Sequence, residues 1–312
     1  MIQFSDLVSF SSLMSTLGTA TIVILAGLGC LMTEQAGMMN IGLDGMITAS
    51  AFAAGVVSWL TGSWILGLLA GLLTGLLLGL FYAVMVVPLK SDEFVIGVTL
   101  NLFLVALSTF LYRNLPPAAD GLHLDMGSGM AIPSISFGGN AGAAVSVSIL
   151  VPVSLALVAV CQAFLYSTRH GFWLRAAGEK PESLRSVGRS PDRMKLVASL
   201  LCGAFCGLSG AYLLNYVHSF TEGISGSRGY VAVACVIFGR SNPLLVTCAA
   251  LFFGLVDTVS TRLQVAGVVD STLTAAFPYV GTILMMLVLA IRNEYRKAGQ
   301  AKSALERQEA VK

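Results

Sequence analysis

Long apolar runs, separated by short polar or glycine-containing breaks, dominate the pattern of hydrophobic positions along this chain of 312 residues. A membrane-spanning helix needs about 20 apolar residues, within a range of roughly 17–25. Charge-free runs that reach or approach this length predict spanning helices at 14–32, 46–60, 63–87, 94–112, 145–166, 196–214, 244–261 and 277–291. A further run at 230–238 is shorter, and such a piece crosses a bilayer only where other protein or a cavity surrounds it. The pattern predicts an all-α polytopic transmembrane bundle of about nine spans, within a range of eight to ten.

The composition supports an integral membrane protein and excludes several other classes. Hydrophobic residues make up 56% of the chain and charged residues 11%, whereas soluble globular domains carry about 25% charged residues. No basic face of domain size exists, so no nucleic-acid partner is expected. The six cysteines lie in apolar runs without the spacing of a disulfide framework or a zinc site. We therefore expect them to be packing residues, and we predict no metal site.

Lysine and arginine predict the orientation, because cytoplasmic loops of membrane proteins carry an excess of both. One choice of side gathers 15 of the 18 basic residues in 33–45, 88–93, 169–195, the turn at Arg240 and the tail from Arg292. That side is predicted to be cytoplasmic, which places the N-terminus outside and the C-terminus inside. Residues 1–312 are then expected to form a single membrane domain, with a cytoplasmic loop at 169–195 and a polar cytoplasmic tail at 292–312.

The outer side is expected to hold two longer segments, 113–144 and 215–228. The first is predicted to be an irregular loop, because it contains Pro116-Pro117, Pro133 and Gly138-Gly139.

The cytoplasmic loop at 169–195 contains a short helix signal. Pro181 suits the first position of a helix, where a missing N–H costs nothing. Glu182 follows in the first turn, where negative charge suits the helix dipole. Gly188 is a candidate C-cap. The signals predict a helix of about two turns, with Leu184 and Val187 on one apolar face.

A helix of this length is too short to be stable alone. Docking into another protein explains it best. The alternative is an ordinary loop made basic by the orientation rule, although the acidic residues Glu179 and Glu182 are not needed for that rule.

Several stretches resemble one known family. LRAAGEKPESLRSVGRSPDRMK resembles the cytoplasmic coupling loop of ABC-importer permeases, which fits a cleft on the ATP-hydrolysing subunit. TEQAGMMNIGLDGMITASAF, SDEFVIGVTLN and YVAVACVIFGRSNPL are similar to permeases of the branched-chain amino acid and ribose superfamily, in the nucleoside and simple-sugar subgroup. The resemblance covers roughly residues 20–290, and NIGLDGM is its most specific piece.

The resemblance implies a type II ABC-importer-like permease in a bacterial inner membrane. Its expected partners are an ABC ATPase subunit, a second permease subunit that is often a different chain, an extracytoplasmic substrate-binding protein and the lipid bilayer. ATP and Mg would bind the partner ATPase, since this chain has no G-x-x-x-x-G-K-[ST] loop, and we expect it to be no enzyme and to bind no cofactor. The residues expected to couple to the ATPase are Gly178, Glu179, Pro181, Glu182, Leu184, Arg185 and Gly188.

The resemblance favours nucleosides as the substrate. A simple-sugar permease of the ribose or galactose type is the alternative. An ion-driven secondary transporter is a third possibility, but it would require charged residues paired within the spans and often internal repeats.

Polar residues within the apolar pattern are candidates for the substrate path, because burying polar groups in lipid is costly. Glu34, Asn40 and Asp44 lie in a glycine-rich break between two runs, and Asn101 lies within a third run. The alternative for Asn40 and Asp44 is that they cap helices at a turn, and for Asn101 that it bonds a neighbouring helix. Asp257 is a second intramembrane acid, for which a structural pair with a residue such as Arg262 is expected.

Overall fold

The computed structural model describes residues 10–115, 131–137 and 145–265, together with helical positions 280, 281, 283 and 287. Its elements are α2 (Phe10–Gln35), α3 (Leu43–Thr61), α4 (Trp64–Val86), α5 (Glu93–Arg113), β1 (Ser134–Phe137), β2 (Val145–Ser148), α6 (Leu150–Ser167), α7 (Arg169–Glu179), α8 (Pro181–Ser186), α9 (Pro191–Val217), α10 (Arg228–Phe238) and α11 (Pro243–Val265). The chain divides into two compact units, Met1–Thr258 and Val259–Lys312. The contacts described below lie within the first unit.

Seven helices of the described part are long and apolar enough to cross a membrane: α2, α3, α4, α5, α6, α9 and α11. They match seven of the predicted runs. The short run corresponds to α10, whose 11 residues rise about 16 Å, roughly half of a bilayer's hydrocarbon core. The run at 277–291 lies almost entirely outside the described residues, and so does the whole tail at 292–312. The total of about nine spans therefore stays a prediction.

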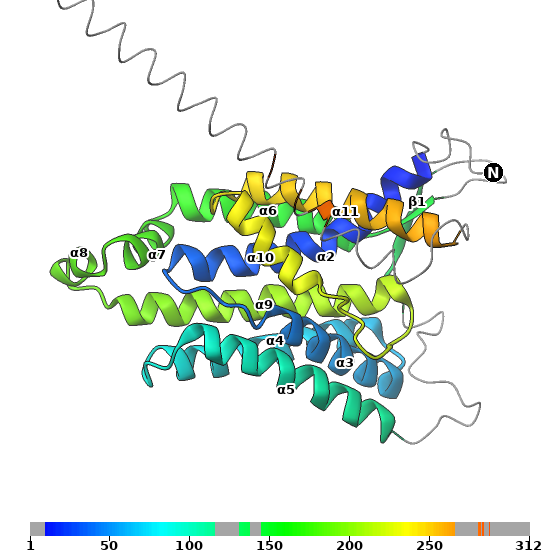
Figure 1. Cartoon of the computed structure of the whole chain (residues 1–312), viewed down its shortest axis with the longest axis horizontal. Coiled ribbons are helices and arrows are strands. Elements are labelled where there is room, and N and C mark those ends of the chain that lie inside the picture. Colours follow the sequence, from blue (N-terminus) through cyan, green and yellow to red (C-terminus); the bar gives the residue numbers. More distant parts are fainter. Residues whose placement is uncertain are drawn as a thin grey trace, which may run out of the picture. The chain divides into compact units, whose positions relative to one another are not determined.

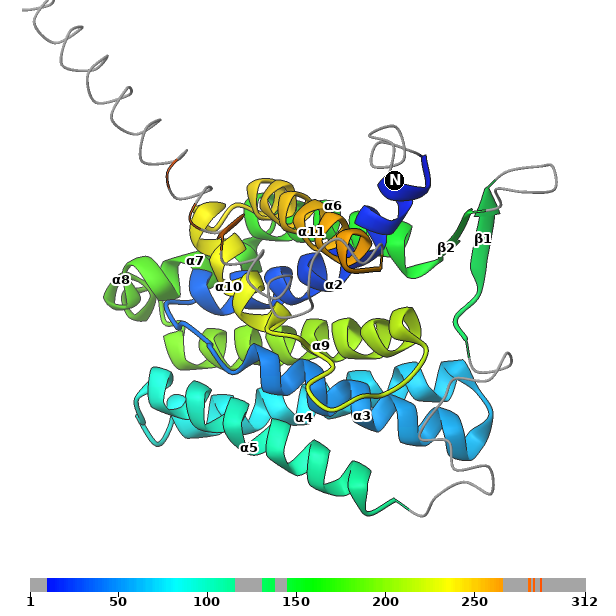
Figure 2. The same ribbon diagram turned by 45° about the vertical axis from the view of Figure 1, so that its right-hand side comes forward.

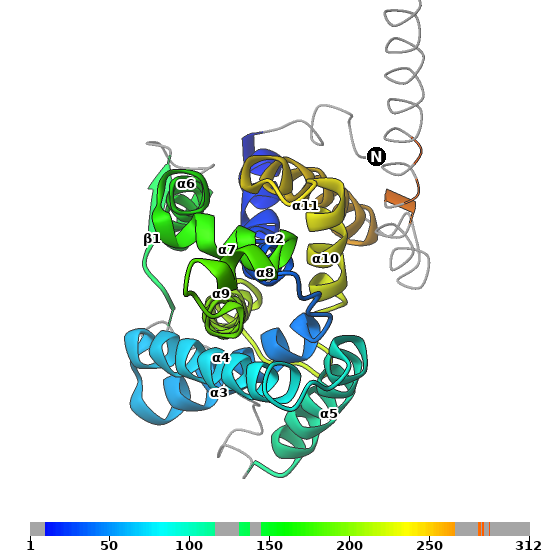
Figure 3. The same ribbon diagram turned by 90° about the vertical axis from the view of Figure 1, so that its left-hand side faces the viewer.

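Helix α9 is the central element of the first unit. It packs against α2, α3, α4 and α7, and the end view in Figure 3 shows these helices around it. The contact with α4 depends on glycines: a Cβ added to Gly75 would overlap the Gly203 carbonyl oxygen, and one added to Gly71 would lie 3.2 Å from the Gly207 carbonyl oxygen. Small residues at helix interfaces let backbones approach closely in lipid.

The fold departs from the all-α prediction in one feature. Strands β1 and β2 form an antiparallel pair (Figure 2) in which Ile135 lies opposite Val147 and Ser136 opposite Ser146. The first strand lies in the segment 113–144 predicted to be irregular, and the second occupies the start of the run 145–166. Both strands alternate serine with an apolar residue, which is the period of a strand. This alternation was not predicted as a strand, because the long apolar run of α6 follows β2 directly.

Candidate functional site

Two helices begin inside the bundle rather than at its end. After Gln35 the chain runs back along α9 before α3 begins (Figure 1). Along this return Asn40 Nδ2 lies 3.5 Å from Cys202 Sγ, and Cys202 is 11 residues beyond the start of α9, a rise of about 16 Å. Helix α10 begins nearby, because the Gly229 N–H donates to Asp44 Oδ1 at 3.0 Å. The N-termini of α3 and α10 therefore meet within the bundle.

Asn101 of α5 holds the start of α3. Its Oδ1 accepts a hydrogen bond from the Gly45 N–H at 2.7 Å. Its Nδ2 donates to the Ile41 carbonyl at 2.7 Å and to the Tyr230 hydroxyl at 3.0 Å. The side chain is 3% exposed. Asn101 thus bonds three segments at once: the chain before α3, the first turn of α3 and the first turn of α10.

Asp44 caps α10 from its place in the first turn of α3. Besides the bond to Gly229, its Oδ2 accepts from the Ser225 hydroxyl at 2.8 Å. A carboxylate is stabilised near helix N-termini by the helix dipole. Asn40 is fully buried, and its Oδ1 accepts from the Gly42 N–H at 2.9 Å. Asp44 therefore caps a helix, whereas Asn40 bonds the backbone just before α3, which has no side-chain cap of its own.

These bonds satisfy backbone groups that two helix breaks leave open. Non-helical backbone at membrane depth is tolerated only where it is buried in protein or lines a cavity. Glu34 differs from the other three candidates, because its side chain is half-buried and makes no hydrogen bond or ion pair within the described part of the chain. A role of these four residues in the substrate path stays a prediction.

The structure also brings in residues that sequence reasoning missed. Ser225, Gly229 and the Ile41 carbonyl complete the network. No spacing in the sequence links residues separated by up to 185 positions, so only the fold reveals them.

Asp257 has a charged partner on α10. The Arg228 guanidinium donates to Asp257 Oδ2 at 3.0 Å, and the two side chains are 23% and 30% exposed. Arg228 also donates to the Ser225 carbonyl at 3.3 Å, which ties the ion pair to the segment that Asp44 holds. A structural pair for Asp257 was expected, but with a neighbour in sequence rather than with Arg228.

The loop predicted at 169–195 contains two helices. Helix α7 was not predicted, and the Thr168 hydroxyl caps it by accepting the Gly171 N–H at 3.1 Å. Helix α8 begins at Pro181, as predicted. It ends at Ser186. Gly188, two residues further on, lies in the left-handed region at φ 74°, and its N–H donates to the Arg185 carbonyl at 2.9 Å.

The outer face of α8 differs from the prediction. Leu184 is 3% exposed and Val187 is 72% exposed, so the two do not share one face. The reason is that α8 ends at Ser186, and Val187 already belongs to the turn that follows. Glu182 and Arg185 are exposed, as are Glu179 and Pro181. The surface that α8 offers is therefore charged, with Val187 as its apolar residue.

The end of α7 touches the end of α2 backbone to backbone. A Cβ added to Gly178 would lie 2.5 Å from the Gln35 carbonyl oxygen and 2.7 Å from the Gly37 nitrogen. Gly37 has φ 76°, and a Cβ there would lie 2.9 Å from the Gly178 Cα. The Gln35 side chain also donates to the Ser241 carbonyl, beyond the end of α10, at 2.6 Å. The charged loop thus contacts the chain that leads into the helix breaks.

At the other end of α9, an exposed ion pair joins α5 to the segment before α10. Arg113 Nε and Nη2 donate to the two carboxylate oxygens of Glu222 at 2.7 and 2.8 Å. The hydrogen bond from Arg113 lowers the pKa of Glu222 below its ordinary value. Both side chains are well exposed, so solvent screens the pair.

Comparison with known proteins bears on this arrangement. The chain is 28% identical to a nucleoside ABC transporter permease protein of Lactococcus lactis subsp. cremoris, over 86% of this chain and 88% of the relative. It is 26% identical to a guanosine ABC transporter permease protein of Bacillus subtilis, over 94% and 97%. It is 29% identical to a putative glucose ABC transporter permease protein of Haloferax volcanii, over 90% and 92%. No solved structure matches the chain significantly.

The family model described as "Branched-chain amino acid transport system / permease component" matches residues 12–291. That range includes every described helix from α3 to α11 and nearly all of α2. The seven apolar helices make the chain a multi-pass membrane protein. The match covers most of the sequence, and the chain therefore belongs to this family of ABC transporter permeases.

Proposed function

We propose that this chain is a membrane-spanning subunit of an ATP-driven importer that carries nucleosides into a bacterial cell. The observation that carries the coupling role is the α7–α8 element, whose outer face is charged and whose inner end contacts α2 through Gly178 and Gly37. The relatives named for nucleosides and guanosine support the substrate.

The proposed orientation places α7 and α8 in the cytoplasm, where ABC ATPase subunits would bind them. Most lysine and arginine residues then lie on the cytoplasmic side, as the orientation rule requires. The N-terminus is outside and the C-terminus inside. A second permease subunit completes the path, and a substrate-binding protein delivers the nucleoside to the outer face. ATP and Mg bind the ATPase subunits, and this chain contributes no catalytic residue.

The contacts suggest how motion could pass from the ATPase to the path. A shift of α8 moves the end of α7. At that end, Gly178 packs against the backbone of residues 35–37 with no free space between them. That segment leads into α3, whose Asp44 holds the start of α10. Packed elements respond by discrete shifts rather than by gradual deformation. The two helices that begin inside the bundle are therefore the elements that we expect to move.

Uptake of labelled uridine and adenosine tests the proposal. Cells would produce this chain with its genetic neighbours, either intact or with an ATPase subunit that cannot hydrolyse ATP. We expect uptake only with the intact ATPase, and no competition from excess unlabelled ribose or glucose. Competition by a sugar would instead support the sugar alternative, which the relative named for glucose raises. Uptake with the inactive ATPase would refute the importer and its coupling element.

Charge reversal on α8 tests the ATPase contact. Glu182→Lys and Arg185→Glu should each weaken copurification of the ATPase by about two- to fivefold, since exposed ion pairs contribute little. Val187→Asp should have a larger effect, about tenfold, because it removes the exposed apolar contact. All three side chains are exposed, so membrane insertion should be unchanged. Lys90→Glu, an exposed charge reversal in the loop before α5, is the control. Unchanged copurification in all three variants would place the ATPase contact elsewhere.

A further inference from the structure

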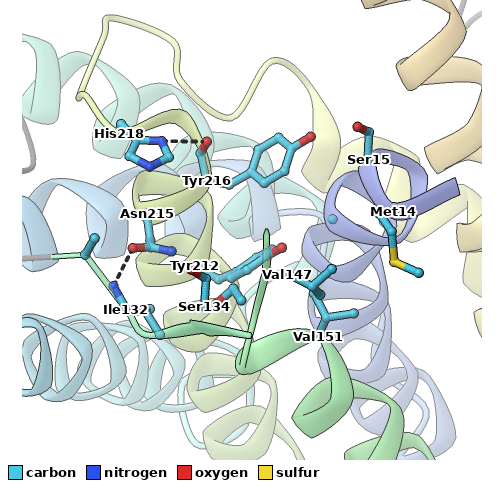
Figure 4. Close-up of a pocket in the computed structure, with 13 residues that line it drawn as sticks. Met14, Ser15, Ile132, Ser134, Val147, Val151, Tyr212, Asn215, Tyr216 and His218 are labelled. Carbon is cyan, nitrogen blue, oxygen red and sulfur yellow. Dashed lines mark hydrogen bonds between the residues drawn. The ribbon is translucent and has the colours of Figure 1, made fainter. Parts of the chain in front are cut away.

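A cavity of about 220 Å³ lies at the end of α9 opposite to α8. The start of α2, strands β1 and β2, the start of α6 and the last residues of α9 line it (Figure 4). The 27 residues of α9 rise about 40 Å, so the cavity and α8 lie on opposite sides of a membrane that α9 crosses. In the proposed orientation the cavity is on the outer side, where substrate would arrive.

Asn215 offers a hydrogen-bond donor to this cavity. Its Oδ1 accepts the Ile132 N–H at 2.7 Å, which fixes the orientation of the amide. In Figure 4 its Nδ2 points away from Ile132, into the space that the drawn residues surround. Asn215 is 6% exposed, and Nδ2 has no hydrogen-bond partner among the described residues. The fully buried side-chain atoms without a partner in the described chain are Ser50 Oγ, Gln162 Oε1 and Arg175 Nε. Nδ2 is therefore open to the cavity, where it can donate a hydrogen bond to a ligand.

The walls of the cavity indicate what kind of ligand fits. The rings of Tyr212 and Tyr216 lie with centroids 6.2 Å apart, and Met14, Val147 and Val151 add apolar surface. No aspartate, glutamate, lysine or arginine of the described chain lines the cavity. Ser15, Ser134, Ser148 and His218 add polar side chains to the lining. The two aromatic rings offer faces on which a planar ring can stack, and Asn215 offers that ring a fixed hydrogen-bond donor.

The size of the cavity limits the ligand further. Pockets for drug-sized molecules measure about 300–1,000 Å³, whereas this one measures about 220 Å³. It suits a single heterocycle rather than a heterocycle with its sugar fully enclosed. We propose that the cavity receives the base of an incoming nucleoside, with the carbonyl oxygen at position 4 of a pyrimidine such as uracil accepting a hydrogen bond from Asn215 Nδ2. This inference rests on the proposed nucleoside import.

Asn215→Asp is the sharpest test of this site. The carboxylate keeps an oxygen to accept the Ile132 N–H, but it replaces the free donor with an acceptor. At position 4 of the pyrimidine ring, uridine has a carbonyl group and cytidine has an amino group. The wild-type chain should therefore bind uridine more tightly than cytidine, and the variant should reverse this preference, with a change in the ratio of about tenfold or more. A purely structural role of Asn215 would weaken both ligands alike.

The measurement is equilibrium binding of radiolabelled uridine and cytidine to the permease–ATPase complex in nanodiscs at pH 8, where the new carboxyl is ionised. The binding protein is left out, so that the selectivity is that of the permease. Asn242→Asp is the matched control, because Asn242 Oδ1 likewise accepts a backbone N–H, that of Leu244, at 3.0 Å. It lies outside the cavity lining and should leave the ratio unchanged.

If Asn215→Asp does not fold, Ala131→Leu provides a second test of the cavity. Ala131 is half-buried in the cavity lining, so the larger side chain should weaken both ligands about tenfold without changing their ratio. An unchanged affinity in this variant, or an unchanged ratio in folded Asn215→Asp, would overturn the cavity proposal while uptake by the wild type still supports nucleoside import. Absence of nucleoside uptake by the wild-type transporter would overturn the proposed function and this inference with it.

Discussion

Gly178→Ala is expected to reduce ATP-dependent uptake at least tenfold while the protein still inserts into the membrane. The added Cβ would lie 2.5 Å from the Gln35 carbonyl oxygen, 2.7 Å from the Gly37 nitrogen and 3.0 Å from the Ala36 carbonyl carbon. All three are backbone atoms, so no side chain can rotate to make room. Adding a methyl to a packed site typically costs about 1–3 kcal/mol. The end of α7 must therefore shift away from α2, at the point where we propose that motion passes inward.

Uptake and ATP hydrolysis should be measured together in proteoliposomes. We expect hydrolysis to continue in Gly178→Ala while uptake falls, which is the signature of lost coupling. Gly188→Ala is the control in the same loop: unlike Gly178, Gly188 has a positive φ, of 74°, so alanine strains the backbone there, but its Cβ would meet nothing within 4 Å. If Gly188→Ala lost as much uptake as Gly178→Ala, strain in the loop rather than the contact with α2 would be the cause.

Sequence alone predicts the helices of this fold well, because the length and composition of each apolar run indicate a spanning helix without information from other segments. Seven runs correspond to seven helices that could span a membrane. Pro181 marks the start of α8 through local backbone chemistry, and the structure confirms it, whereas Gly188 lies two residues beyond the last helical residue, Ser186. These features depend on residues that are near one another in sequence.

The site is harder to predict, because its contacts join distant segments. Asp44 was an obvious polar candidate, yet its partners Ser225 and Gly229 are more than 180 residues away. Leu184 and Val187 were expected on one face, but α8 ends at Ser186, so Leu184 is buried and Val187 is exposed in the turn that follows. Asn215 was not predicted as a site residue, because it lies directly after an apolar run, where a polar residue indicates the start of a loop.

The network around Asn101 makes a second strong prediction. Asn101→Leu keeps a similar volume but leaves the Gly45 N–H, the Ile41 carbonyl and the Tyr230 hydroxyl without their partner. A buried unsatisfied group typically costs about 1–3 kcal/mol, although hydrogen bonds between membrane helices often contribute less. We expect a total loss of about 2–5 kcal/mol, which corresponds to a fall in Tm of roughly 5–15 °C. The Tm of the detergent-purified protein would measure it.

Graded variants separate this structural role from a role in the substrate path. Tyr230→Phe removes one of the three bonds and should lower Tm less than Asn101→Leu does. Asn101→Asp keeps the acceptor for Gly45 and should lie between the two. Thr99→Val, at an exposed position on the same helix, should leave Tm unchanged. If Asn101→Leu instead raised the KM for uptake with no change in Tm, Asn101 would contact substrate, and the start of α3 would be held by the rest of its packing. Because the three partners of Asn101 belong to three different segments, we expect the loss of stability to dominate.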